Sequence, residues 1–218
     1  MKIFLLGATG RTGKLVVDEA LRRGHELNCL VRDAQKIKSA NERLNIFEGS
    51  VERKSDLEAP MKNCDAIINV LNISRKSDFP WAKLRTSPVF LSDVMKNIVE
   101  LAEINKIKRM VACSAWGVAE TKKDIPGWFR WLIDNSNIGH TYKDHERQEK
   151  LLMNSTLSWT IVRPTGLTNF KKYQHVIESY DNKPKPRMTV NRISLAKYLV
   201  DAISNERLVY KVPVISGR

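Results

Sequence analysis

Short apolar runs alternate with longer amphipathic segments along the chain. Residues 3–6 are continuously apolar, which is typical of a strand buried on both faces of a parallel sheet. Apolar residues then recur at helical spacing over residues 12–23, and Gly24 is placed to end that helix. The same criteria predict further strands at residues 27–31, 44–47, 66–71, 110–113, 160–162 and 209–214. They predict further helices at residues 57–61, 89–104, 141–153 and 195–203, a helix start at Pro126 and a loop at residues 72–87.

This alternation of strands and helices predicts an α/β fold. The expected architecture is a doubly wound parallel sheet with right-handed crossovers, the three-layer α/β/α arrangement of Rossmann folds. With 218 residues, 42% of them hydrophobic, the chain can bury one sizeable core and is short for two domains. We therefore expect residues 1–218 to form a single domain.

A glycine-rich turn joins the first predicted strand to the first predicted helix. The three glycines of such a turn permit a tight bend, close approach of the backbone to a pyrophosphate, and close packing of helix on strand. A purely structural turn is the alternative, but the strand–turn–helix context favours a phosphate site. The turn therefore predicts a bound dinucleotide, held by Gly7, Ala8, Thr9, Gly10, Arg11, Thr12 and Gly13.

The end of the second predicted strand indicates which dinucleotide is bound. NAD-binding folds place an acidic residue there to accept a hydrogen bond from the ribose 2′-hydroxyl. Val31 takes that position here, and the next residue, Arg32, can present its guanidinium to a 2′-phosphate. NADP(H) is therefore preferred. NAD(H) stays an alternative, because Asp33 follows and could reach the ribose.

Charge and composition limit the other classes of function. The formal net charge of +13 is spread evenly, with +6 on residues 1–109 and +7 on residues 110–218, and the cations are interspersed with acids. This is typical of a solvated surface, so we expect no nucleic-acid partner. No segment reaches the roughly 18 apolar residues of a membrane span, and no cleavable signal is present, which predicts a cytoplasmic protein without a membrane partner.

The sequence contains no motif for a metal site, a disulfide framework or a serine hydrolase. The cysteines Cys29, Cys64 and Cys113 lie in or beside apolar runs without metal-ligand spacing. The four histidines also lack such spacing, and no GxSxG nucleophile motif occurs. We expect no metal site and no hydrolase activity.

Five segments together resemble the atypical short-chain dehydrogenases, over nearly the whole chain: GATGRTG, CLVRD, VACSA, LSWTIVRPTGL and NRISLAKYLVDAI. Within that group the chain looks most like the NmrA-type and flavin/biliverdin-IXβ-reductase-like NAD(P)H-binding proteins. The resemblance implies substrate-side elements mainly in residues 115–218. It also implies cofactor contacts from Ser50, Val51, Leu71, Asn72, Ser114, Pro164 and Thr165.

The ordinary acid–base pair of this superfamily is missing. Aligned on LSWTIVRP, the family's Tyr-x-x-x-Lys motif falls on Thr141 and His145, with Tyr142 one position off. His145 is the candidate proton donor, Ser114 a candidate contact to nicotinamide or substrate, and Tyr142 a further catalytic candidate. A surface histidine paired with Glu149, four residues on, is an equally plausible role for His145.

Three functions are compatible with these motifs. The first is an NADPH-dependent reductase that transfers hydride to a small planar acceptor such as a flavin or quinone, which needs no Tyr–Lys pair because its proton can come from solvent. The second is a non-catalytic NADP(H) sensor of the NmrA type with a regulatory protein partner. The third, a sugar-nucleotide epimerase or dehydratase, needs the missing pair. The aromatic segment Trp128–Trp131, with Trp116, lies where the family shapes its substrate pocket, although core packing explains it equally well.

Overall fold

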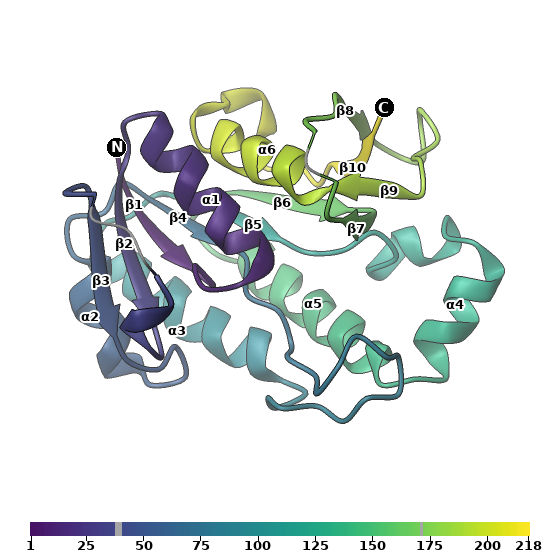
Figure 1. Cartoon of the computed structure of the whole chain (residues 1–218), viewed down its shortest axis with the longest axis horizontal. Helices are drawn as coiled ribbons and strands as arrows, with labels where there is room; N and C mark the ends of the chain where they lie inside the picture. Colours follow the sequence, from purple (N-terminus) through teal and green to yellow (C-terminus); the bar gives the residue numbers. More distant parts are fainter. Residues whose placement is uncertain (38–40, 171) are drawn as a thin grey trace.

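In the computed structural model, which describes residues 1–37, 41–170 and 172–218, eight strands form one sheet in the order β3-β2-β1-β4-β5-β6-β10-β8 (Figure 1). The strands are β1 (Lys2–Leu6), β2 (Glu26–Val31), β3 (Leu44–Glu48), β4 (Ala66–Asn69), β5 (Arg109–Cys113), β6 (Ser158–Pro164), β8 (Val176–Ser179) and β10 (Val214–Gly217). All neighbouring pairs are parallel except β8 and β10. The doubly wound α/β prediction is confirmed.

Helices cover both faces of the sheet (Figure 1). The α-helices are α1 (Arg11–Arg22), α2 (Lys54–Met61), α3 (Phe90–Ile104), α4 (Gly127–Asp134), α5 (Ile138–Met153) and α6 (Arg192–Ser204). Alternate residues of β1 explain this layering: Ile3 and Leu5 are buried with α1 and α6, whereas Phe4 and Leu6 are buried with α2, α3 and α5. β1, which is apolar from residue 3 to residue 6, therefore lies inside the sheet between β2 and β4, as its composition predicts.

The last predicted strand was misplaced. It was expected at residues 209–214, but β10 begins at Val214. Pro213 has no backbone N–H to donate to a ladder, and Tyr210 has a left-handed φ of 57°, so the preceding residues turn and do not pair regularly.

Three short strands were missed entirely. β8 pairs antiparallel at the sheet edge, and β7 (Gly166–Thr168) pairs with β9 (Thr189–Asn191) in a separate two-stranded sheet. Each has only three or four residues, which is too short for a periodic signal. β7 begins two residues after the end of β6, so this small sheet starts at the carboxyl end of that strand.

Candidate functional site

The glycine-rich turn is closed by contacts that only glycine allows. Gly7 has a φ of 87°, and a Cβ placed on it would lie 3.0 Å from the carbonyl oxygen of Val70. At Gly13 a Cβ would lie 2.0 Å from the carbonyl oxygen of Gly7, because the first turn of α1 packs directly on the end of β1. The glycines thus have the close-packing roles expected of a nucleotide-binding turn.

The start of α1 is suited to an anion. Gly10 caps the helix without a side chain, and the first turn of α1 holds no acidic residue. Backbone N–H groups at a helix start carry partial positive charge and bind phosphate. These N–H groups are therefore open to a diphosphate.

A cavity of about 400 Å³ lies over this turn. It is bounded by the loops that follow β1 and β4, which are neighbours in the sheet and whose chains leave to opposite faces. This is the switch point at which doubly wound folds bind ligands. Ten of the expected cofactor residues line it: Gly7, Thr9, Gly10, Arg11, Thr12, Gly13, Arg32, Leu71, Asn72 and Ser114.

Arg32 and Asp33, the two residues that follow β2, have different surroundings. Arg32 is exposed and lines the cavity. The Asp33 carboxylate instead accepts a hydrogen bond from the backbone N–H of Gln35 at 3.1 Å and pairs with Lys36 at 3.3 Å. Arg32 therefore lines the cavity, whereas Asp33 does not.

Three expected cofactor residues lie elsewhere. Ala8 is buried under the turn, with 1% of its surface exposed. Ser50 donates its backbone N–H to Asp56 at 2.8 Å, and Val51 packs against the core on the α2–α3 side of the sheet. Neither Ser50 nor Val51 is among the described residues that line the cavity over the turn.

A second cavity, of about 440 Å³, adjoins the first. The two share Asn72, Ser114 and His145 among their lining residues. The second is walled by Trp116, Trp128, Phe129, Ile138, Thr141, Tyr142, Pro164, Thr165, Leu167 and Met188. The cleft thus has a polar half over the glycine turn and an aromatic half beyond His145, and much of the predicted substrate-side aromatic segment lines the latter.

Three buried polar atoms at the junction have no hydrogen-bond partner within the described part of the chain: Ser114 Oγ, His145 Nδ1 and Thr165 Oγ1. A buried polar group without a partner costs free energy, and such groups commonly await a ligand or water. All three line the cleft. This clustering fits a cofactor and a substrate that meet at the carboxyl ends of β5 and β6.

His145 is a buried, neutral residue, which corrects the alternative of a surface histidine paired with Glu149. Only 3% of His145 is exposed, and Glu149 is engaged by Arg163 through hydrogen bonds of 2.6 and 3.0 Å. Burial lowers the pKa of His145 to about 4. The side chain is therefore an imidazole at neutral pH, because its charged form would be desolvated.

We expect the buried imidazole to make the fold sensitive to acid. The unfolded chain binds a proton at His145 below its ordinary pKa of 6.5, whereas the folded protein resists protonation until about pH 4. Stability should thus fall by about 2 kcal/mol between pH 7 and pH 5 through this residue. Urea unfolding of the wild type and of His145→Gln at both pH values measures it. Equal pH dependence in the two proteins would contradict the prediction.

Tyr142 is not activated as an acid. Burial raises its pKa, and its ring packs edge-on against Phe129 with centroids 6.1 Å apart. A superfamily tyrosine that donates a proton needs its pKa lowered by a nearby cation. Tyr142 therefore lines the aromatic half of the cleft as a neutral phenol.

Sequence reasoning missed several charged residues in the polar half. Asp78 accepts two hydrogen bonds from Arg11, of 2.9 and 3.0 Å, across the cavity. Arg75 donates to the carbonyl oxygens of Phe79 and Pro80, and Arg192 donates to Asn169 at 2.6 Å. The loop residues carry no periodic signal. Arg192 lies in NRISLAKYLVDAI, a segment that carried the resemblance but no assigned role.

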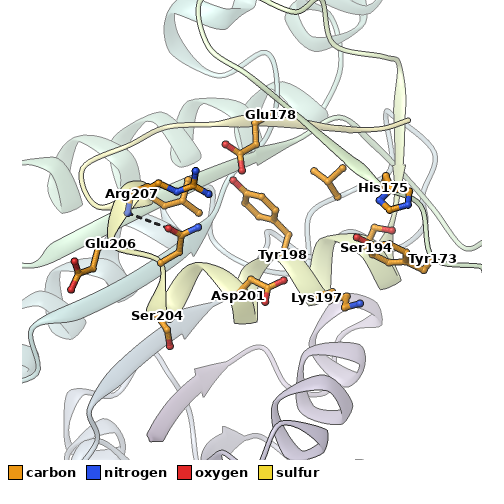
Figure 2. Close-up of a pocket in the computed structure, with 13 residues that line it drawn as sticks. Tyr173, His175, Glu178, Ser194, Lys197, Tyr198, Asp201, Ser204, Glu206 and Arg207 are labelled. Atoms are coloured by element: carbon orange, nitrogen blue, oxygen red, sulfur yellow. Dashed lines mark hydrogen bonds between the residues drawn. The ribbon is translucent and has the colours of Figure 1, made fainter.

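A larger cavity lies away from this cleft. It measures about 710 Å³ and runs along α6 and η3 (Glu206–Leu208), where Tyr198 points toward Glu178 (Figure 2). It has no glycine turn at its edge, and it shares no described lining residue with either half of the cleft. Size alone therefore does not make it the dinucleotide site.

The described residues bring no three His, Cys, Asp or Glu side chains together in a metal-binding cluster. None of the helices seen in the structure has the length and apolar character needed to cross a membrane.

Fold and cleft together define a Rossmann-type dinucleotide-binding protein. Residues 7–206 match the family described as NAD(P)H-binding, and the chain belongs to that family. The whole chain is 26% identical over 227 residues to photosystem II assembly factor Ycf39 of Synechocystis and spans 63% of that relative's length. These matches confirm the family resemblance and the nicotinamide class of cofactor.

Solved structures share the fold. A short-chain dehydrogenase/reductase from Veillonella parvula in complex with NADP superposes with a TM-score of 0.80 at 20% identity, covering 99% of this chain and 94% of that one. ChuY, an anaerobillin reductase from Escherichia coli O157:H7, superposes with a TM-score of 0.78 at 16% identity, covering 100% and 97%. At these identities the likeness establishes the fold alone.

Proposed function

We propose that the protein is an NADPH-dependent reductase that transfers a hydride to a planar acceptor of the flavin or quinone class. The observation that carries this proposal is the aromatic half of the cleft, which meets the dinucleotide half at Ser114 and His145. An aromatic-walled cavity of about 440 Å³ has the size of a small-molecule site and offers ring faces to a flat ligand. ChuY, an anaerobillin reductase with the same fold, shows that this fold can carry a reductase activity.

NADPH is favoured over NADH by the end of β2. Arg32 lines the cavity, and its guanidinium suits a 2′-phosphate, whereas Asp33 is engaged by the backbone N–H of Gln35 and by Lys36 and does not line it. Arg11, Arg75 and Arg192 add positive charge to the polar half. The bound cofactor would supply the hydride.

The residues at the junction would orient the reactants and would not deliver the proton. His145 is neutral at pH 7, and the phenol of Tyr142 is a weaker acid than usual. A flavin or quinone accepts the hydride and takes its proton from water, so reduction consumes one NADPH and one proton per acceptor. Ser114, Thr165 and the neutral imidazole of His145 supply hydrogen bonds that hold the rings.

A non-catalytic NADP(H) sensor is the second candidate. It is supported by the same acid–base observation, because an unactivated Tyr142 and a neutral His145 are also compatible with a cleft that only binds. An epimerase or dehydratase is disfavoured, because those reactions need the Tyr–Lys pair.

NADPH oxidation with FMN, FAD and a soluble quinone as acceptors tests the proposal, together with fluorescence titration of NADPH and NADH. We expect turnover with at least one acceptor and tighter binding of NADPH than of NADH. Arg32→Ala should weaken NADPH by more than about tenfold, the effect of losing a charged contact of about 1.5–3 kcal/mol, and leave NADH unchanged. Lys96→Ala, an exposed cation outside the cleft, is the matched control. Tight binding without any turnover would favour the sensor.

A further inference from the structure

Four exposed aromatic side chains gather beside the aromatic half of the cleft, and one of them, Trp128, also lines it. Phe79 and Trp81 come from the segment between β4 and α3, and Trp128 and Trp131 lie one turn apart on α4. Their exposed fractions are 62%, 44%, 65% and 59%. Ring centroids lie 5.4 Å apart for Phe79 and Trp81 and 6.5 Å apart for Trp81 and Trp131. We call these four residues the aromatic patch.

The patch is held in place by defined contacts. The segment after β4 folds back on itself, with a bridge between Arg75 and Leu84, and runs beside α4 and the start of α5 (Figure 1). The indole N–H of Trp81 donates to the carbonyl oxygen of Asn135, and the amide of Asn137 donates to the carbonyl oxygen of Trp81, both at 2.8 Å. Large aromatic side chains that are held exposed together generally mark a binding surface.

The surroundings of the patch are basic. Lys76, Lys83 and Arg85 flank its tip on the folded-back segment, and Lys123 and Arg130 flank it on the α4 side; all five are exposed. Two of the three acids nearest in sequence are already paired, Asp78 with Arg11 and Asp134 with Lys122, whereas Asp124, next to Lys123, makes no ion pair with the described residues. Indole rings that sit at headgroup level, ringed by lysine and arginine, form the combination that holds peripheral proteins on anionic lipid.

We propose that the aromatic patch docks the protein on an anionic lipid surface. The sequence predicts no membrane partner because no segment can span a bilayer, but docking through side chains needs no span. Trp128 belongs both to the patch and to the cavity wall, so docking would turn the aromatic half of the cleft toward the lipid. A lipid-soluble quinone would then enter directly from the membrane, a consequence that rests on the proposed function.

Sedimentation with vesicles tests the docking without any catalytic readout. Wild-type protein should pellet with vesicles of phosphatidylcholine containing about 30% phosphatidylglycerol, should pellet far less with pure phosphatidylcholine, and should be released by 0.5 M NaCl. Phe79→Ser/Trp131→Ser should lower binding at least about tenfold, and so should Lys76→Glu/Lys83→Glu. None of these four residues lines either half of the cleft within the described chain, so NADPH affinity should stay within about twofold and report that the variants are folded.

Matched controls lie at the other end of the strands, near the amino ends of β4 and β5. Ile104→Ser removes an apolar side chain that is 67% exposed at the end of α3, and Lys62→Glu/Lys108→Glu makes the same change in net charge as the lysine pair of the patch. Both controls should bind vesicles like the wild type. Docking is overturned if the wild type does not pellet with anionic vesicles, or if the controls lose binding equally. It is also overturned if light scattering shows a wild-type dimer that the patch variants convert to a monomer. Lack of turnover in the acceptor assay would leave this result unaffected.

Discussion

Replacing Gly13 with alanine should abolish dinucleotide binding and destabilise the protein. The added Cβ would lie 2.0 Å from the carbonyl oxygen of Gly7, 2.7 Å from its carbonyl carbon and 2.9 Å from the Cα of Ala8. All three neighbours are backbone atoms, so no side chain can move aside. To relieve these clashes, α1 must shift away from β1. This shift moves the N–H groups of its first turn away from the phosphate position. Overpacking of this kind costs about 3 kcal/mol or more, at the upper end of its usual range.

Two other glycines provide a graded comparison for Gly13→Ala. Gly10→Ala brings a Cβ only to 3.2 Å from Gly7, so we expect a partial loss of affinity. Gly127→Ala, at the start of α4, has no heavy atom within 4 Å of the new Cβ and should be neutral or slightly stabilising. NADPH titration and urea unfolding measure the series. Wild-type affinity in Gly13→Ala would show that the turn does not bind the dinucleotide.

The parts of the fold that were predictable are those that the sheet buries on both faces. β1 is apolar at positions 3–6 because α1 covers one face and α3 the other, and the turn that follows has a spacing imposed by backbone contacts. The edge strand β8 was not predictable, because four residues paired on one side leave no periodic pattern. The strands in the middle of the sheet were therefore predicted, and the strand at its β10 side was not.

The polar face of α5 shows why the site was predicted only in part. Asp144, His145, Gln148 and Glu149 are all buried, although hydropathy places such residues at a helix surface. Each of three has a specific partner: Asp144 accepts from Ser92 at 2.6 Å, Gln148 accepts from Asn69 at 3.2 Å, and Glu149 pairs with Arg163. Because those partners are distant in sequence, no local sequence pattern indicates that these polar side chains are buried. The Nδ1 atom of His145 has no such partner among the described residues, and His145 lines the cleft.

The ion pair of Arg163 with Glu149 joins β6 to α5 close to His145. Arg163, on β6, is 1% exposed and contacts the buried Glu149 on α5 and the exposed Glu120 of η2 (Ala119–Lys123). Burial opposes the charge on Arg163, but the hydrogen bonds that it donates to Glu149 and Glu120 outweigh this effect and raise the pKa of Arg163. Glu149 follows His145 by one helical turn. We therefore expect the position of α5 on the sheet, and with it that of the imidazole, to depend on this pair.

Arg163→Met should cost about 3–5 kcal/mol of unfolding free energy, because it leaves the carboxylate of Glu149 buried without a counter-charge. Arg163→Met/Glu149→Met should recover most of that loss, since a buried ion pair and a packed apolar pair of similar volume are often close in stability. Arg11→Ala is the matched control, because it breaks an exposed arginine–aspartate pair and should cost less than about 1 kcal/mol. Urea unfolding of the four proteins measures these differences. If Arg163→Met were no more damaging than Arg11→Ala, α5 would be held by its apolar contacts alone, and the placement of His145 would not depend on the pair.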